Sequence, residues 1–526
     1  MRDLHLPGRS PVFATNGMCA TSHPLAAKVA VQILESGGNA VDAAIAAAML
    51  LGICEPQMTG IGGDCFILFS PNGLDGVVAL NGSGRAPAGL SAENMRKAGH
   101  KTVPVQGVES VTIPGAIDAF CRLSNDYGRL GLAGSLAPAI YYAKAGIPVA
   151  PRVAFDWALA ANTLQGDAKR FYLLDGKAPQ VGQIFRAPKQ AEVLERIAIE
   201  GRDGFYEGAV AQDMVASLNA LGGSHTLDDF ANTQSEYTTP VTGEYKGTEL
   251  VEHPPNGQGA TAILMNNILA QFDVAGMDAF GTERAHIEAE AAKLAYDARN
   301  RFIADPDRTT RLDHMLLQDT ANALAALIDP KRAMASAAKT SENVHKDTVY
   351  LTVVDKDRMS VSLIYSIYKS FGSGLASSKF GINFQNRGSG FTLQEGHPNE
   401  AMGGRRPMHT IIPGMLRKGG KVTMPFGVMG GHYQSCGHAR FMSNMLDFGM
   451  DAQTAIDAPR CFDDGLVMNV ERGYSDTVRA ELADMGHNVA VPKVPIGGAQ
   501  SILINYETGV LEGASDPRKD GCALGY

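Results

Sequence analysis

Residues 345–368 read HKDTVYLTVVDKDRMSVSLIYSIY, and the interpretation of the rest of the chain depends on them. Two runs rich in β-branched and aromatic residues, Thr348–Val354 and Ser360–Tyr368, are joined by the polar stretch Asp355–Arg358. This pattern is typical of two strands in a hairpin. Residues 331–347, directly upstream, are polar and lack apolar periodicity, so we expect a mobile connector there.

Thr348 opens the first of these strands, directly after the expected connector. A threonine in this position meets the requirement of an N-terminal nucleophile. If the bond between Asp347 and Thr348 were cut, the new α-amine, with a reference pKa of ~7.7–8.0, could take the proton of the side-chain hydroxyl. One residue would then supply both nucleophile and base. The alternative is that Thr348 is an ordinary strand residue.

The overall composition is that of an ordinary globular protein. Of 526 residues, 45% are hydrophobic and 19% charged, a length that fits two to four domains or one large intertwined unit. The formal net charge of −9 gives no electrostatic reason to expect nucleic acid or an anionic membrane as partner. We therefore expect neither.

The cysteines and the N-terminus bear on the compartment. Seven scattered cysteines without CxxC spacing argue against a disulfide framework and favour a reducing environment. Residues 1–17 lack the apolar core of a secretion signal, and the longest apolar run, Ala43–Leu51, is too short to span a bilayer. We expect a cytoplasmic protein.

The N-terminal region predicts two helices followed by a glycine-rich turn. Ser22 is expected to cap the first helix, and Asn39 to cap the second, Ala40–Cys54, whose apolar faces predict burial between layers. The glycine cluster Thr59–Asp64 precedes a predicted strand. Its spacing fits neither nucleotide-binding fingerprint, so a tight turn is favoured over a phosphate loop.

Two long motifs resemble the γ-glutamyltranspeptidase family of self-processing N-terminal-nucleophile hydrolases. Residues 35–68, ESGGNAVDAAIAAAMLLGICEPQMTGIGGDCFIL, are similar to the opening of the family's large subunit. TVYLTVVDKD at 348–357, followed by Phe371–Gly374, Arg405–Met408 and Gly430–Gly431, resembles its small subunit. The resemblance implies an α/β fold, a four-layer α/β/β/α sandwich. It also implies a large segment 1–347 and a small segment 348–526, intertwined in one domain.

The resemblance assigns catalytic roles to four residues of the second half. Thr348 is the nucleophile, and Ser366, eighteen positions later, is the hydroxyl residue that hydrogen-bonds it. Gly430 and Gly431 form the oxyanion hole, since paired glycines let backbone N–H groups approach an acyl group closely. No cofactor is expected.

A metal site is the rival interpretation of the same region. His432, Cys436 and His438 could supply ligands, although no second cluster in the sequence completes a tetrahedral set. We therefore expect no metal in the reaction.

Substrate recognition is where this chain departs from the family pattern. The positions that bind the substrate α-amino group in the family hold Tyr368, Arg387 and Gly390 here, and its paired serines become His409 and Thr410. An ammonium beside Arg387 would meet like charge. These substitutions predict a pocket, shortened by Tyr368, for a small acyl amide that bears an anion and lacks an α-amine.

Arg85 is a further candidate for binding that anion. The family's carboxylate-binding arginine stands three residues before an Ala-Pro pair, where this chain has Ser83. Arg85 could replace it with a shifted backbone, because a guanidinium matches a carboxylate in geometry, or it could be an ordinary surface arginine.

Three functions remain open from the sequence. The first is an amidohydrolase acting on an oxamate-like amide. The second is a γ-glutamyl hydrolase or transpeptidase acting on glutathione. The third is an unprocessed, inactive binding scaffold. The expected partners are a small-molecule amide and the two segments of one precursor.

Overall fold

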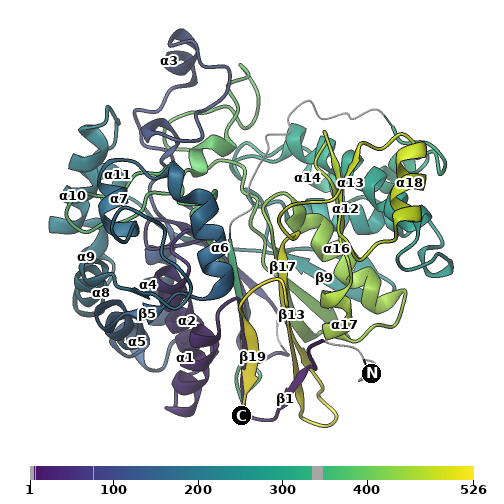
Figure 1. Ribbon diagram of the computed structural model, residues 1–526, viewed down its shortest axis with the longest axis horizontal. Coiled ribbons are helices and arrows are strands. Elements are labelled where there is room, and N and C mark those ends of the chain that lie inside the picture. The colour runs from purple at the N-terminus through teal and green to yellow at the C-terminus, as the bar shows by residue number, and fades with distance from the viewer. Residues whose placement is uncertain (1–4, 6–7, 75, 335–347) are drawn as a thin grey trace.

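The computed structural model describes residues 5, 8–74, 76–334 and 348–526 (Figure 1). Two seven-stranded antiparallel sheets pack face to face, and helices cover the outer face of each (Figure 1). This arrangement confirms the four-layer α/β/β/α sandwich. The connector predicted at 331–347 lies outside the described residues from 335 onward, and so does Asp347.

The first sheet has the predicted hairpin at its centre. β10 and β11 pair antiparallel, with Val349 opposite Tyr365. β11 ends at Ser366, two residues earlier than predicted. In spatial order the strands are β19 (Cys522–Gly525), β2 (Met18–Thr21), β10 (Val349–Val354), β11 (Ser360–Ser366), β3 (Asp64–Ser70), β4 (Val78–Gly82) and β7 (Glu236–Thr238).

The second sheet also combines strands from both sides of residue 347. In spatial order they are β1 (Val12–Ala14), β18 (Leu511–Ser515), β17 (Gly498–Ile504), β13 (Lys421–Met429), β12 (Gly414–Lys418), β9 (Thr248–Glu252) and β8 (Val241–Tyr245). Because each sheet needs strands from both parts of the chain, neither part has a complete core of its own.

The helices of the first outer layer come from the N-terminal half. Every residue of α2 is buried, as its uniformly apolar sequence predicted. The layer consists of α1 (Pro24–Glu35), α2 (Ala40–Cys54), α4 (Ala116–Tyr127), α5 (Gly131–Ala145), α6 (Pro151–Ala160), α7 (Gly166–Tyr172), α8 (Pro188–Glu200), α9 (Asp203–Tyr206), α10 (Gly208–Asn219) and α11 (Leu227–Ala231).

The second outer layer packs on the other sheet and carries a small side unit. Its helices are α12 (Gly259–Leu269), α13 (Thr282–Phe302), α14 (Leu312–Leu316), α15 (Gln318–Ala325), α16 (Tyr433–Leu446) and α17 (Ala452–Asp457). The side unit, packed on α13, consists of β14 (Cys461–Asp463), β15 (Met468–Val470), α18 (Asp476–Asp484) and β16 (Val489–Ala490).

The remaining elements are short. They are α3 (Ala92–Lys97), the pair β5 (Ile147–Pro148) and β6 (Ile184–Phe185), and the 3₁₀ helices η1 (Val108–Ser110), η2 (Ala161–Thr163), η3 (Val274–Gly276) and η4 (Arg387–Gly390).

The packing between the sheets aligns the start of β10 with the end of β13. The Tyr350 ring lies so close to Gly427 that a Cβ there would come within 2.3 Å of it. Further along the hairpin, Ser362, which pairs with Thr352, donates to the carbonyl of Phe426 at 3.2 Å. Residues nearer the start of β10 therefore lie opposite residues nearer the end of β13. It follows that the residues just before β10 and just after β13 lie at the same end of the core.

One helix cap differs from the prediction. His23, not Ser22, caps α1, and its Nδ1 accepts from the Leu25 N–H at 3.2 Å. The Ser22 hydroxyl donates instead to the buried carboxylate of Glu55. Asn39 caps α2 as predicted and forms a capping box with Asp42.

Two further features concern the cysteines and the helices. All seven cysteines are free thiols in this structure. In the part of the chain that the structure describes, no helix has both the length and the apolarity needed to cross a bilayer.

Candidate active site

The hairpin places Thr348 opposite Ser366. The register that pairs Val349 with Tyr365 aligns the residues just outside that pair, and Thr348 Oγ1 lies 3.3 Å from Ser366 Oγ. Both side chains are buried. The candidate nucleophile therefore has the second hydroxyl group beside it that the family pattern requires.

Tyr368 connects this hydroxyl pair to Arg387. The Tyr368 N–H donates to Ser366 Oγ at 2.8 Å. Tyr368 has a φ of 80°, a left-handed conformation that non-glycine residues rarely adopt and that is often found at functional sites. Its ring stacks under the Arg387 guanidinium, with Cζ 4.1 Å from the ring centroid.

Arg387 is a buried cation that forms no ion pair with a carboxylate of the described residues. Its side chain is 0% exposed, and its Nη1 donates to Thr410 Oγ1 at 3.2 Å. Within the described residues, Nε and Nη2 have no hydrogen-bond partner. Burial lowers the pKa of Arg387 to about 10, while Tyr368 and Asp64 oppose the shift, so the guanidinium keeps its charge at neutral pH.

His409 adds a neutral acceptor next to Thr410. Its Nε2 lies 3.2 Å from Asp64 Oδ2. Burial, and next the charge of Arg387, lower the pKa of His409 to about 3, so the ring is neutral at pH 7. Since a carboxylate only accepts, Nε2 carries the proton. Nδ1 keeps a lone pair and has no partner among the described residues.

Gly430 and Gly431 follow β13 at the same end of the core as Thr348. Their φ angles are 138° and 57°, and a Cβ on Gly430 would come within 3.0 Å of the Gly497 Cα. Other residue types would be strained or crowded here. The two residues to which the resemblance assigns the oxyanion hole therefore sit where the backbone conformation and the space favour glycine.

Gln258 connects the loop of Gly430 and Gly431 to Thr410, which lies beside Arg387. Its Nε2 donates to the carbonyl of Thr410 at 2.6 Å and to that of Gly431 at 3.3 Å. Arg299 in turn donates to Gln258 Oε1 at 2.7 Å. A continuous series of contacts thus links Thr348 to Gly431 through the hairpin, Arg387 and Thr410.

Asp64 is a buried residue of the candidate site that the sequence interpretation missed. Its Oδ1 accepts from the N–H groups of Gly84 and Gly115, at 2.9 and 3.0 Å, and from the Gln385 amide at 2.9 Å. It also fixes the ring of His409. Asp64 thus connects several loops of the site. The sequence signal that could have identified it is a charged residue at the start of a buried strand.

Arg85 lies outside this series of contacts. It is 40% exposed and pairs with Glu236 at 3.1 Å and with Asp305 at 3.4 Å. Ser83, at the family's arginine position, is buried, and its hydroxyl donates to Asn81 at 2.8 Å. The role of Arg85 in binding a substrate carboxylate stays a prediction.

The rival metal site is not assembled in the described part of the chain. His438 uses Nδ1 to bind Glu252 at 2.6 Å and Nε2 to accept from the Val428 N–H at 3.2 Å. Cys436 contacts the Tyr296 hydroxyl at 3.1 Å. Among the residues that the structure describes, these side chains and His432 do not gather closely enough to hold one ion.

Ser366→Ala should separate catalysis from folding. The change removes the hydroxyl beside Thr348 and leaves the Tyr368 N–H without its acceptor, so we expect a loss of about 10–100-fold in kcat. Ser362→Ala is the matched control, because it removes a buried hydroxyl from the same strand, 2.8 Å from the Tyr350 hydroxyl. Steady-state kinetics should show the loss only for Ser366→Ala; equal losses would contradict its role.

Comparison with known proteins agrees with this geometry. A family profile described as gamma-glutamyltranspeptidase matches residues 26–526. The chain is 35% identical to the Glutathione hydrolase-like YwrD proenzyme of Bacillus subtilis, over 98% of this chain and 99% of the relative. It is 32% identical to the Oxamate amidohydrolase proenzyme of Klebsiella pneumoniae, over 98% of this chain and 99% of the relative.

A solved structure gives the same result. The crystal structure of cephalosporin acylase from Bacillus halodurans is similar with a TM-score of 0.93 and 37% identity, over 100% of this chain and 98% of that one. The family profile, the relatives of nearly equal length and the similar fold all indicate the same family. The chain is a member of the gamma-glutamyltranspeptidase family of N-terminal-nucleophile hydrolases.

Proposed function

We propose that the protein is a self-cleaving amidohydrolase that hydrolyses a small acyl amide bearing a carboxylate, through an acyl-enzyme on Thr348. The observation that carries this proposal is Arg387, a buried guanidinium with two unpartnered nitrogens and no carboxylate partner among the described residues. Such a cation is costly to bury, and an anionic substrate would offset that cost.

Cleavage of the bond between Asp347 and Thr348 would activate the site. It divides the chain into segments 1–347 and 348–526 and frees the Thr348 α-amine. That amine takes the proton of Oγ1, which attacks the amide carbon of the substrate. The N–H groups of Gly430 and Gly431 stabilise the oxyanion. The leaving ammonia takes the proton from the amine, and water then hydrolyses the ester and regenerates Thr348.

The polar groups around Arg387 support the choice of substrate. Arg387 offers N–H donors and His409 a neutral acceptor, whereas no carboxylate of the described ranges lies in hydrogen-bond contact with Arg387 to receive an ammonium. A substrate α-amine next to this guanidinium would meet like charge. An oxamate-like amide, with its carboxylate next to the reacting carbonyl and no amine, fits these groups.

Hydrolysis of glutathione is the second candidate function. The identity of 35% to a protein named glutathione hydrolase-like favours it. An unprocessed, inactive scaffold is the third, and a denaturing gel tests it directly. Two bands whose masses add up to 55.6 kDa support cleavage, and one band at that mass supports the scaffold.

A comparison of oxamate with glutathione as substrates separates the two candidate enzymatic functions. We expect kcat/KM for ammonia release from oxamate to exceed that for glutamate release from glutathione by about 100-fold or more, since a desolvated like-charge contact costs several kcal/mol. Oxamide is the control, because it replaces the carboxylate by a neutral amide of similar shape. Preference for glutathione, or equal rates with oxamide and oxamate, would reject the anionic amide.

We also propose that the protein works in the cytoplasm. All seven cysteines are free thiols, as expected for a reducing compartment. Fractionation of cells that produce the protein would test this location.

A further inference from the structure

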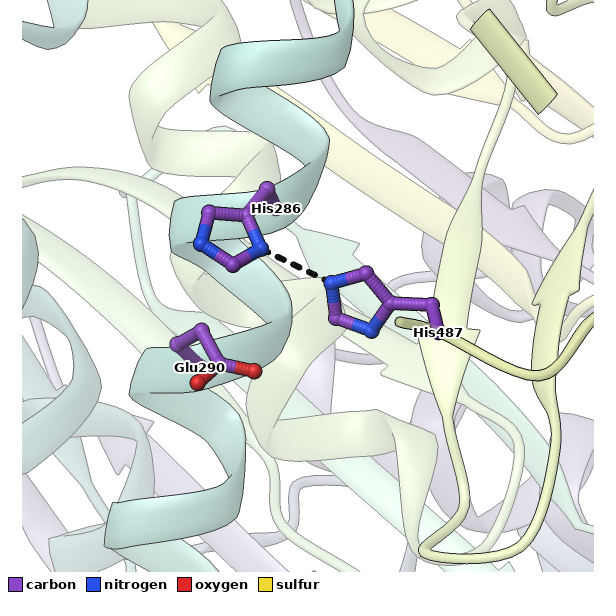
Figure 2. A group of neighbouring side chains, drawn as sticks. All are labelled: His286, Glu290 and His487. Carbon is purple, nitrogen blue, oxygen red and sulfur yellow. Dashed lines mark hydrogen bonds between the residues drawn. The ribbon is translucent and has the colours of Figure 1, made fainter. Parts of the chain in front are cut away.

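Three buried side chains meet where α13 faces the loop between α18 and β16 (Figure 2). His286 and Glu290 lie one turn apart on α13, on the same face of the helix. His487 lies in the facing loop and points at His286 (Figure 2). Their ligand atoms all lie within 4.8 Å of one another, and no other group of this kind occurs in the described ranges.

The hydrogen bonds of His286 determine which ring nitrogen is available. Its Nε2 lies 2.8 Å from the carbonyl oxygen of Asp329. A carbonyl oxygen only accepts, so Nε2 carries the proton and Nδ1 of the neutral ring keeps a lone pair. That Nδ1 lies 2.8 Å from His487 Nε2, the contact drawn as a dashed line in Figure 2.

His487 is oriented in a complementary way. Its Nδ1 lies 3.7 Å from Asp463 Oδ2 and has no hydrogen-bond partner among the described residues. If Nε2 of the neutral ring donates to His286, Nδ1 turns a lone pair toward a carboxylate, which is repulsive. If Nε2 binds a metal instead, Nδ1 carries the proton and faces an acceptor. Metal-binding histidines commonly have such a carbonyl or carboxylate on their outer nitrogen.

The charges around the group also favour a cation. Lys293 Nζ donates to Glu290 Oε1 at 2.8 Å and lies 3.3 Å from Asp463 Oδ2. Glu290 Oε2 accepts from the Met334 N–H at 2.8 Å. With both imidazoles neutral, two carboxylates face one ammonium, so the buried group carries one excess negative charge. Each carboxylate oxygen has a further lone pair for a metal.

We propose that this group is a binding site for a first-row divalent metal ion of the Zn²⁺ type. His286 Nδ1, His487 Nε2 and a Glu290 oxygen are the protein ligands, and a water fills the fourth position of a tetrahedron. Two nitrogens at about 2.0–2.1 Å from a tetrahedral ion are roughly 3.3–3.4 Å apart. The two nitrogens therefore need to separate by about half an ångström from their present contact, and the rings to turn their lone pairs toward the ion.

The site joins the two parts of the chain. His286 and Glu290 belong to segment 1–347, and His487 belongs to segment 348–526. Glu290 also accepts from the backbone N–H of Met334, the last described residue of the large segment. The ion would act as a structural link between the segments, and metal binding can be measured whether or not the chain is cleaved.

A cobalt titration of the full-length protein, stripped with a chelator and dialysed, tests the site. We expect one equivalent of Co²⁺ to give the visible absorption of a four- or five-coordinate ion and Zn²⁺ to displace it. His286→Gln keeps a donor for the Asp329 carbonyl and removes the Nδ1 ligand. His487→Asn keeps a group near Asp463 and removes Nε2. Each change should weaken Co²⁺ binding by about 100-fold or more.

A third histidine provides the matched control. His225 is buried and its Nε2 lies 3.0 Å from the Val111 carbonyl, so His225→Gln changes a similar environment and should leave Co²⁺ binding intact. X-ray absorption of the Zn²⁺-loaded wild type should show imidazole and oxygen neighbours, and this readout decides if either variant fails to fold. Absence of binding, sulfur neighbours, or unchanged binding in both folded variants would overturn the proposal. In that case a protonated His487 accounts for the contacts.

Discussion

Thr348→Ala is expected to give a folded protein that stays one chain of 55.6 kDa and has lost activity by a factor on the order of 10⁴ or more. The change removes the only atom that the proposed mechanism uses as a nucleophile, both for cleavage before residue 348 and for attack on the substrate. It removes little packing, so the melting temperature should change by only a few degrees. A denaturing gel and an ammonia-release assay measure the two effects.

Two neighbouring substitutions make this result specific. Thr348→Ser keeps the hydroxyl and should cleave slowly and retain some activity. Thr352→Ala removes another buried hydroxyl from β10, one that donates to the Val361 carbonyl at 2.9 Å. It should lower stability by about 1–2 kcal/mol and leave cleavage complete. Two bands or full activity from Thr348→Ala would show that Thr348 is not the nucleophile.

The elements of the site that lie close together in the sequence were predictable from it. A hairpin with two alternating runs and a short polar turn has a fixed register, and this register places position 348 opposite position 366. The spacing of Ser366 from Thr348 is therefore a consequence of strand pairing. The buried helix Ala40–Cys54 was equally predictable, because a segment that is apolar on every face has to lie inside.

The parts that the sequence did not predict depend on contacts between distant segments. Gln258 bonds Thr410 and Gly431 across more than 150 positions, and a single glutamine before a helix carries no local sign of that role. Asp64 was assigned to a turn, because its partners lie on four other loops that are distant in the sequence. The spacing of motifs in the sequence likewise could not predict the ion pairs of Arg85 with Glu236 and Asp305.

Arg387→Met is expected to raise KM for the anionic amide by about 30–1,000-fold, which corresponds to about 2–4 kcal/mol of lost charge-assisted binding. Methionine keeps the aliphatic part of the side chain and removes the guanidinium, which the proposed mechanism does not use in bond making, so kcat should change much less. Stability should stay the same or rise, since the change removes a buried charge that has no carboxylate partner within the described residues. Steady-state kinetics and thermal unfolding measure the two effects.

Arg406→Met is the matched control, since Arg406 is equally buried but fully partnered. Its three nitrogens donate to the carbonyls of Ser83 and Gln234 and to the Glu236 carboxylate, at 2.9–3.0 Å. Its loss leaves the two carbonyls without this donor and Glu236 with Arg85 alone, and should lower stability by about 1–3 kcal/mol. A stable Arg387→Met with high KM, beside an unstable Arg406→Met, identifies Arg387 as the substrate's cation. If Arg387→Met instead unfolds as readily and binds substrate normally once folded, Arg387 is structural and the anionic substrate loses its support.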